Sequence, residues 1–391
     1  MRFITIIFLI IVVTQALGQA IADIYLPSFP AIVIGLNTNI QNVELSLTIY
    51  ALGYGLSQLV YGPLSDGIGR RKPMLAGLFL CTMGSVICLM APDIQVLLLG
   101  RLCQGLGAGA TLTIGGAMLR DLFEGPTLSK YNSYAGIVFV IFLSMAPLLG
   151  GYIQEHMGWR PIFGFMTICS LLVLLGFIFI IPETNKYIKP ENLQFKIIKQ
   201  HIHTLITSSI FIGYTSCSLL TYGAILAWVT ASSALLENVV GLSPVQYGWV
   251  YAASGAAFAM GAFANSKFVS RFGINLMLQI GLIGMLMSGV IMLMLQLLGY
   301  INTAVIAWPV VLLLFSASLV FPNTSAGLFQ PFPHIAGIAS ALFYSSRLLG
   351  GALFSGLIAW IPHATQMPIA LAFIISATLS WIIFAITIMR R

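Results

Sequence analysis

Long apolar segments alternate with short polar gaps along the whole chain. Each segment holds about 20 residues, the length that an α-helix needs to cross the roughly 30 Å hydrocarbon layer of a bilayer. Soluble cores are not built from apolar runs of this length, so the pattern indicates an all-α polytopic membrane protein. Twelve membrane-spanning helices are predicted, at residues 3–26, 42–64, 74–91, 94–119, 129–154, 160–181, 205–230, 244–266, 275–297, 303–326, 336–361 and 367–389.

The longest polar gap, from Pro182 to Thr204, divides the twelve spans into two sets of six. A weak internal repeat supports this division, because Leu148–Gly151 recurs as Leu348–Gly351, and residues 66–69 have a counterpart at 270–273. The repeat predicts two pseudo-symmetric six-helix bundles with a pathway between them. The predicted parts are an N-terminal bundle at 1–181, a cytoplasmic linker at 182–204 with a short interfacial helix at 195–199, and a C-terminal bundle at 205–391.

The basic residues predict how the chain is oriented. If the N-terminus is cytoplasmic, fourteen of the 17 Lys and Arg residues fall on the cytoplasmic side, whereas Arg160 lies on the far side and Arg101 and Arg347 lie inside spans. Positive charge is retained in the cytoplasm, so both termini are expected there. The fourteen are Arg2, Arg70, Arg71, Lys72, Arg120, Lys130, Lys186, Lys189, Lys196, Lys199, Lys267, Arg271, Arg390 and Arg391.

The composition excludes several classes of protein. Of 391 residues, 59% are hydrophobic and 7% are charged, and the formal net charge is +7. The basic residues lie in short gaps rather than on one face, so no nucleic-acid partner is expected. The five cysteines lie in apolar segments without metal-ligand spacing, and no glycine-rich loop ends in Lys-Ser or Lys-Thr. We therefore expect no enzyme, no metal and no ATP site. The apolar run at residues 3–17 has the length of a signal sequence but continues to Leu26, which favours a first span.

The gap between the second and third spans, Gly62–Pro73, is dense in glycine, proline and charge. Residues 62–71 fit the pattern G-x-L-x-D-x-x-G-R-R/K at every key position. This stretch resembles the loop motif that members of the major facilitator superfamily carry between helices 2 and 3. Arg101 followed by Gln104 is similar to the helix-4 motif of that family.

Two further stretches narrow the resemblance. Residues 146–151 are similar to the helix-5 antiporter motif of the family, with Ala146 where glycine is usual. Asp23, Pro27 and Pro30 at the end of the first helix resemble the Bcr/CflA drug-resistance subfamily. The antiporter motif residues Pro147, Gly150 and Gly151 are expected to weaken helix 5, to permit close packing and to seal the outer half against ion leak.

The resemblance covers essentially the whole chain and implies the fold of the major facilitator superfamily and a drug:proton antiporter. Such a protein is an exporter in the bacterial inner membrane, works by alternating access of two bundles, and is driven by the proton gradient without a bound cofactor. The implied partners are a small-molecule substrate and the lipid bilayer, with the chain acting as a monomer. Two other hypotheses are an exporter dedicated to one anionic metabolite, such as a siderophore or organic acid, and a membrane receptor that uses a transporter fold.

The hairpin at residues 62–73 is predicted to form a cytoplasmic gate. We expect Asp66 to cap a helix N-terminus of the opposite half and Arg70 to pair with Asp121. These contacts would hold the cytoplasmic side shut and break when that side opens. The alternative is that residues 70–72 only set the topology. The gate residues are Gly62, Asp66, Gly69, Arg70, Arg120 and Asp121.

Ionisable residues inside spans are costly unless they are paired or hydrated, so they indicate functional sites. Asp23 is the acid best placed in the polar, broken end of a span, and we predict that it carries the coupled proton with Arg101 near it. The alternative is that Asp23 only caps or hydrates the helix break at Pro27.

A substrate cavity between the bundles is predicted from polar and aromatic residues within the spans. Multidrug members of the family often carry an acid where this chain has Gln15, so attraction of cationic drugs is weakened. Arg347 either binds an anionic substrate group through its guanidinium or hydrogen-bonds to backbone carbonyls. The predicted cavity residues are Gln15, Tyr50, Tyr54, Gln104, Tyr134, Tyr222, Trp228 and Arg347.

Overall fold

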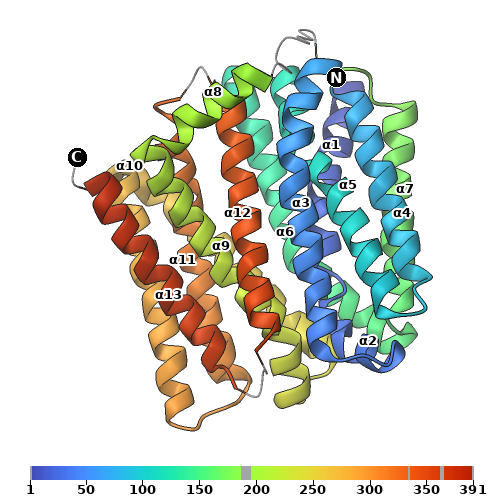
Figure 1. The fold of residues 1–391 in the computed structure, drawn as a ribbon, viewed down its shortest axis with the longest axis vertical. Coiled ribbons are helices and arrows are strands. Elements are labelled where there is room, and N and C mark those ends of the chain that lie inside the picture. The colour runs from blue at the N-terminus through green and yellow to red at the C-terminus, as the bar shows by residue number, and fades with distance from the viewer. Residues whose placement is uncertain (1, 186–194, 333–334, 362–364, 390–391) are drawn as a thin grey trace.

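The computed structural model describes residues 2–185, 195–332, 335–361 and 365–389, and nearly all of them are helical (Figure 1). The first half contains α1 (Arg2–Asp23), α2 (Phe29–Gly35), α3 (Ile40–Ile68), α4 (Arg71–Leu89), α5 (Ile94–Leu122), α6 (Gly125–Met157) and α7 (Arg160–Phe179). The second half contains α8 (Phe195–Ile206), α9 (Ser209–Ser233), α10 (Pro244–Leu297), α11 (Thr303–Phe329), α12 (Ala336–Ala359) and α13 (Met367–Phe384).

The helices account for the twelve predicted spans. Among the described residues, ten helices are long and apolar enough to cross a membrane. One of these, α10, has 54 residues and is two spans joined at Gly273, whose φ of +79° breaks the helix. The remaining span is α3, which has 29 residues but a more polar composition than the others. The prediction of twelve spans in an all-α membrane fold is confirmed.

The two halves stand side by side as helical bundles that meet along α3, α12, α6 and α10 (Figure 1). Within lipid each backbone polar group needs an internal partner, which helices provide, and side-chain caps complete several helix starts. The N-cap side chains of α3, α5 and α11 are Asn39, Asp93 and Asn302, which accept backbone N–H bonds of 2.9 to 3.0 Å.

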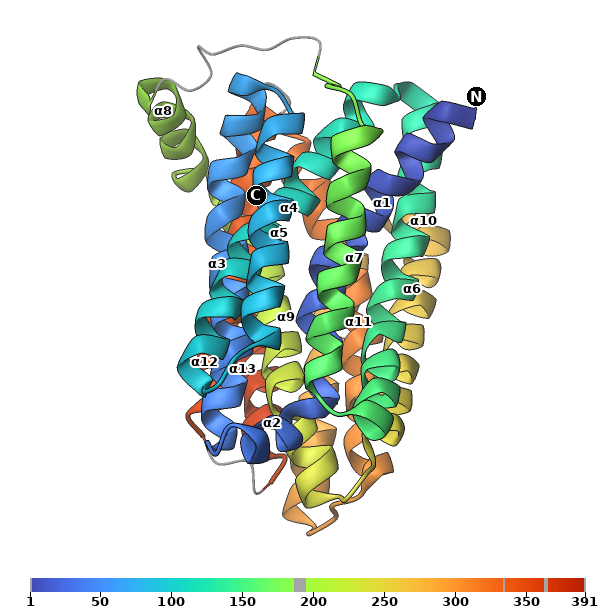
Figure 2. The ribbon, with the colours of Figure 1, turned by 90° about the vertical axis from the view of Figure 1, so that its right-hand side faces the viewer.

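One end of the molecule, which we call the hairpin end, carries the turn from α3 to α4 at Gly69 and Arg70. Helix α8 lies at this same end, and α1 begins there (Figures 1 and 2). Gly69 has φ +93°, and Gly273 has almost the same backbone conformation in the second half. The two turns are therefore structural counterparts, as the weak repeat at 66–69 and 270–273 predicts.

The first span is interrupted near the opposite end of the molecule. Helix α1 stops at Asp23, a single turn of 3₁₀-helix follows at Leu26–Ser28, and α2 resumes at Phe29. Pro27 and Pro30 occupy early positions in the two short helices, where the missing N–H of proline costs nothing. Asp23 thus lies at a break in the helix, next to backbone groups that do not take part in regular α-helical hydrogen bonding.

Candidate functional site

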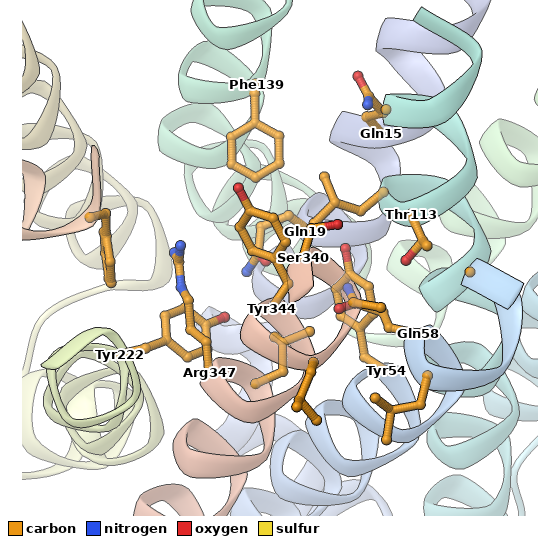
Figure 3. A pocket seen from close by; sticks show the side chains of 18 of the residues that line it. Gln15, Gln19, Tyr54, Gln58, Thr113, Phe139, Tyr222, Ser340, Tyr344 and Arg347 are labelled. Carbon is orange, nitrogen blue, oxygen red and sulfur yellow. The ribbon is translucent and has the colours of Figure 1, made fainter. Parts of the chain in front are cut away.

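A cavity of about 800 Å³ lies between the two bundles. Side chains from α1, α3, α5 and α6 line it on one side, and side chains from α9 to α12 line it on the other (Figure 3). The lining continues to the hairpin end, where it includes Asp66, Arg120 and His201 of α8. The side chain of Asp66 is 41% exposed and Arg120 is exposed, so the cavity reaches solvent at this end.

The bundles pack directly against each other at the end opposite the hairpin. The hydroxyl of Ser355 on α12 lies 2.8 Å from that of Thr48 on α3 and accepts a 2.8 Å hydrogen bond from Thr230 on α9. Nearer the middle, the Ser345 hydroxyl donates to the carbonyl oxygen of Gly55 at 2.7 Å. We call this the closed end, because these contacts join α3 of the first half to α12 of the second.

Asp23 lines the cavity and is 2% exposed. Its carboxylate accepts a 3.3 Å hydrogen bond from Nε2 of Gln19, one turn earlier on α1. The hydroxyl of Tyr251, from α10 of the other half, also reaches this carboxylate. The acid is therefore contacted from both bundles.

Arg101 of α5 is fully buried and is not part of the cavity wall. Its Nη1 donates to the carbonyl oxygen of Ile21 at 3.1 Å and to Oε1 of Gln104 at 2.7 Å. Its guanidinium carbon lies 4.2 Å and 4.3 Å from the ring centres of Tyr25 and Tyr50. The structure therefore places Arg101 as an anchor that holds the end of α1 against α5, rather than as a cation of the cavity.

The other predicted cavity residues divide into two groups. Gln15, Tyr54, Tyr222, Trp228 and Arg347 line the large cavity together with Asp23. Figure 3 shows Arg347 and Tyr222 on one side and Tyr54 on the other.

Three predicted cavity residues lie elsewhere. The hydroxyl of Tyr50 donates to the carbonyl oxygen of Gly18, and its ring packs on Arg101. Gln104 is fully buried and donates to Ser85 at 2.8 Å. Tyr134 is 46% exposed on α6 and absent from the cavity lining. Their placement in the cavity is therefore corrected, because a polar or aromatic side chain on a span also satisfies neighbouring helices or faces lipid.

Two glutamines of the cavity were not predicted. Gln19 donates to Asp23, and Gln58 of α3 lines the cavity with neither its Oε1 nor its Nε2 hydrogen-bonded to any residue that the structure describes. A signal for Gln19 exists in the sequence, because Gln15, Gln19 and Asp23 recur every four residues and so form one polar stripe on an apolar helix. No such stripe marks Gln58.

The hairpin residues form a compact ionic cluster. Arg70 forms an ion pair with Asp66, a 3.1 Å Nε–Oδ2 pair with Asp121, and a 2.9 Å hydrogen bond with Ser65. Partial burial disfavours the charge of Arg70, but the two carboxylates outweigh it, so the pKa of Arg70 lies above its ordinary value. The predicted pair of Arg70 and Asp121 is thus present.

The cluster does not close the space between the bundles. Arg70, Asp66 and Asp121 all belong to the first half, and they are paired while the cavity extends to the hairpin end. The expectation that this pair breaks when that end opens is therefore wrong, because an ion pair inside one bundle moves with that bundle. Asp66 also binds Arg70 rather than a helix of the opposite half. Gly62 of α3 faces Ala341 of α12, so the two halves come close to each other at this position near the hairpin end.

The hairpin is joined to the end of α7 by reciprocal capping. The carboxylate of Glu183 accepts the backbone N–H groups of Arg70 at 2.8 Å and Arg71 at 3.1 Å, at the start of α4. The Arg71 guanidinium donates to the carbonyl oxygen of Ile178 at 2.7 Å. The positive φ of Gly69 favours glycine there, and a side chain at this position would also displace the Glu183 carboxylate.

Replacing Glu183 by Gln is expected to lower stability by about 0.5–1 kcal/mol, since Glu183 is exposed and the cap acts through solvent-screened interactions. Partial burial alone raises the pKa of Glu183, but the N–H groups of Asn185, Arg70 and Arg71 outweigh it and bring that pKa below its ordinary value. The contribution is therefore complete above pH about 4.3 and is lost as the pH falls through the lower, folded pKa.

Thermal unfolding in detergent at several pH values measures this effect. We expect Glu183→Gln to unfold at a lower temperature than the parent at pH 7 and to match it at the acid end. The exposed acid Glu124, whose side chain makes no cap hydrogen bond, provides the control Glu124→Gln. Equal losses for the two variants would contradict the capping role.

Helix α6 contacts two other elements at its glycine pair. A side chain at Gly150 would overlap the backbone carbonyl of Ile24 at the break of α1, and one at Gly151 would overlap the carbonyl of Pro244 on α10. Leu148 of α6 packs in turn against Gly248 of α10. The predicted antiporter motif thus lies where α6 meets both the α1 break and the other half.

Gly150→Ala is expected to cost about 1–3 kcal/mol because a methyl group cannot fit against the Ile24 backbone without separating α6 from α1. Transport is expected to fall strongly, since the displaced helix also carries the contact with α10. Gly136→Ala on the same helix is the matched control, because a side chain there meets no atom within 4 Å. Thermal unfolding and transport rates of both variants test this, and equal behaviour of the two would refute it.

No metal site is evident in the described part of the chain, which contains no group of three or more His, Cys, Asp and Glu residues able to hold an ion. Cys81, Cys88 and Cys217 are buried and free.

Two six-helix bundles around a central cavity that is open at one end and sealed at the other define a secondary membrane transporter. The chain belongs to the Major Facilitator Superfamily, whose sequence model matches residues 8–355. It is therefore a multi-pass bacterial membrane transporter and not an enzyme.

Relatives and solved structures agree with this assignment. The chain is 30% identical over 352 residues to a bicyclomycin resistance protein homolog of Haemophilus influenzae, covering 88% of this chain and 87% of that protein. It is 28% identical over 360 residues to multidrug resistance protein D of Escherichia coli, covering 92% and 90%. The xylose transporter XylE from E. coli shares the fold, with a TM-score of 0.75, 14% identity and coverage of 97% and 98%. The resemblance to the superfamily and to its bicyclomycin-resistance members is confirmed.

Proposed function

We propose that the chain is a proton-coupled exporter of small amphipathic organic molecules. The observation that carries this proposal is the position of Asp23, a buried acid in the wall of the central cavity that is contacted by Gln19 of one bundle and Tyr251 of the other. An acid held in this way links its protonation state to the relative position of the bundles. The names of the drug-resistance relatives support organic drugs as the class of cargo.

The proposed orientation places the hairpin end in the cytoplasm of a bacterial cell, with the protein in the inner membrane and both termini inside. Fourteen of the 17 basic residues support it, because positive residues are retained on the cytoplasmic side. In this orientation the cavity is open to the cytoplasm and ready to load substrate.

Export then requires the bundles to rock about the bound substrate. The contact between Thr48 and Ser355 at the closed end separates, and the hairpin end closes. A proton that reaches Asp23 from the outside removes the charge that Gln19 and Tyr251 stabilise, which loosens a contact between the halves. Release of that proton to the cytoplasm restores the contact, so the proton gradient is the only energy source that the cycle needs.

The cavity wall suits an organic molecule with an apolar body. Leu112, Phe139, Ile225, Phe258 and Phe321 supply apolar and aromatic surface. Gln15, the cavity glutamine nearest the start of α1, binds polar groups through an uncharged amide and therefore gives no charge attraction to cations.

Accumulation assays in cells that lack their own efflux pumps test the proposal. Cells expressing the chain are expected to retain less of one or more compounds in a panel that includes bicyclomycin, and a protonophore is expected to abolish the difference. Retention that is unaffected by the protonophore, or binding of compounds without any flux, would contradict a proton-coupled exporter, and the second result would favour a receptor. We also propose that the protein is a monomer, which size analysis of the protein purified from these cells tests.

A further inference from the structure

Arg347 is a cation of the cavity wall with which none of the described acids forms an ion pair. It lies on α12, and its guanidinium carbon is 3.7 Å from the ring centre of Phe321 and 4.8 Å from that of Tyr222. Within the described residues it forms no ion pair and no hydrogen bond, either to a side chain or to a backbone carbonyl. The ring faces hold the guanidinium in place and leave its N–H groups unused.

Two more polar side chains of the cavity lack partners. Gln58 and Trp228 are each 1% exposed, and in the described structure neither the Gln58 amide nor the Trp228 Nε1–H has a hydrogen-bond partner. Both residues line the cavity, Gln58 from α3 and Trp228 from α9. Figure 3 shows Gln58 across the cavity from Arg347. Buried polar groups normally have partners, so unused groups around one cavity indicate a ligand that supplies them.

The acids of the same wall are already engaged. Asp23 accepts a hydrogen bond from Gln19 and faces the hydroxyl of Tyr251, and Asp66 is paired with Arg70. Arg120 at the cavity mouth, like Arg347, has no ion-pair partner among the described residues. The charged side chains of this wall that have neither an ion pair nor a hydrogen bond among the described residues are thus the cations Arg347 and Arg120.

We infer that the cavity selects amphipathic organic anions, whose carboxylate or sulfonate group is bound by Arg347 and whose apolar body lies against Phe139, Leu112 and Ile225. The inference rests on the proposed function, since it names the class of substrate that the exporter carries. A planar guanidinium binds two oxygens of one such group at once, which a neutral analogue cannot match. The Gln58 amide on the opposite wall is then available to a second polar group of the same molecule.

Matched pairs of probes test this inference directly. Purified protein in lipid nanodiscs is titrated with dansylglycinate and its amide, and with 2-naphthoate and 2-naphthamide, so that each pair shares its apolar body and nearly the same shape but differs in the charge of one group. We expect the anion to bind about tenfold or more tightly than its amide, as a hydrogen-bonded charge pair in a low-dielectric cavity provides. If no anion binds more tightly than its amide partner, the inference is wrong.

Variants of Arg347 separate recognition from packing. Arg347→Gln is expected to remove the preference for the anion and to leave the affinity for the amide unchanged, whereas Arg347→Lys retains part of the preference. Equal weakening of both probes would show that Arg347 only supports the cavity wall and would overturn the inference. Transport assays with the same probes distinguish failure of this inference from failure of the proposed function. Proton-coupled transport of the amides without preference for the anions would contradict the inference and still support a proton-coupled exporter. The absence of proton-coupled transport of any probe would contradict both the inference and the proposed function.

Discussion

Replacing Asp23 by Asn is expected to reduce proton-driven export to the background level. Asn has the shape of Asp and can accept a hydrogen bond from Gln19, but it cannot take up and release a proton. In everted membrane vesicles, a pH gradient should therefore drive uptake of a transported compound by the parent chain and not by the variant. Exchange of the same compound across vesicles without a gradient should persist, because substrate binding does not require a proton at this residue.

The control for this experiment is Glu124→Gln, which neutralises an exposed acid outside the cavity. We expect it to transport like the parent chain. Gradient-driven uptake that is unchanged in Asp23→Asn would show that Asp23 only completes the helix break of α1. Loss of both exchange and gradient-driven uptake would show that the variant has lost the cavity rather than the coupling.

Arg101→Leu is expected to have the largest effect on stability. The change leaves the carbonyl oxygen of Ile21 and Oε1 of Gln104 without this donor, each at a cost of about 1–3 kcal/mol, so we expect a total loss of about 2–6 kcal/mol. It also removes a cation from between the rings of Tyr25 and Tyr50. Because these contacts hold the end of α1, the geometry around Asp23 should be lost as well.

A thiol-reactive fluorogenic dye measures this loss, since Cys81 and Cys88 are buried and become reactive only on unfolding. The unfolding temperature in detergent should fall by about 2–7 °C in Arg101→Leu. Arg271→Leu, which removes an exposed cation in the second half, should change it little. A transport defect in Arg101→Leu without any loss of stability would contradict the anchoring role and favour a direct part in proton coupling.

The fold follows from the sequence to a large degree because the bilayer restricts the solutions. Any apolar run of about 20 residues must become a spanning helix, and the charges between runs then fix the topology. The exceptions are informative: α10 continues as one helical element past a turn at Gly273, and α3 is polar because much of its surface lines the cavity or contacts α12 rather than lipid.

The site is less accessible to sequence reasoning, since a polar residue in a span indicates a buried face but not which one. Arg101 and Arg347 look alike in the sequence, yet one anchors α1 and the other faces the cavity. Tyr134 and Tyr54 are likewise both intramembrane tyrosines, and only Tyr54 faces the cavity. The rotation of each helix about its own axis determines which of its residues face the cavity. This rotation depends on packing between segments that are distant in the sequence.

The ionic hairpin shows a second limit. Its sequence pattern specifies which charges meet, and Arg70 does pair with Asp121, but the pattern does not tell whether the pair joins two bundles or stabilises one. In the structure the pair, the Glu183 cap and the Arg71 contact with α7 all lie within the first half. The hairpin therefore stiffens one bundle for movement as a unit.

Proton release on substrate binding tests the central claim most directly. Purified protein in weakly buffered detergent solution is mixed with a panel of amphipathic compounds, and the pH is followed with an indicator dye. We predict that compounds which bind the parent chain release protons, and that the same compounds bind Asp23→Asn without releasing any. Binding without proton release in the parent chain, or equal release from Asp23→Asn, would contradict coupling through Asp23.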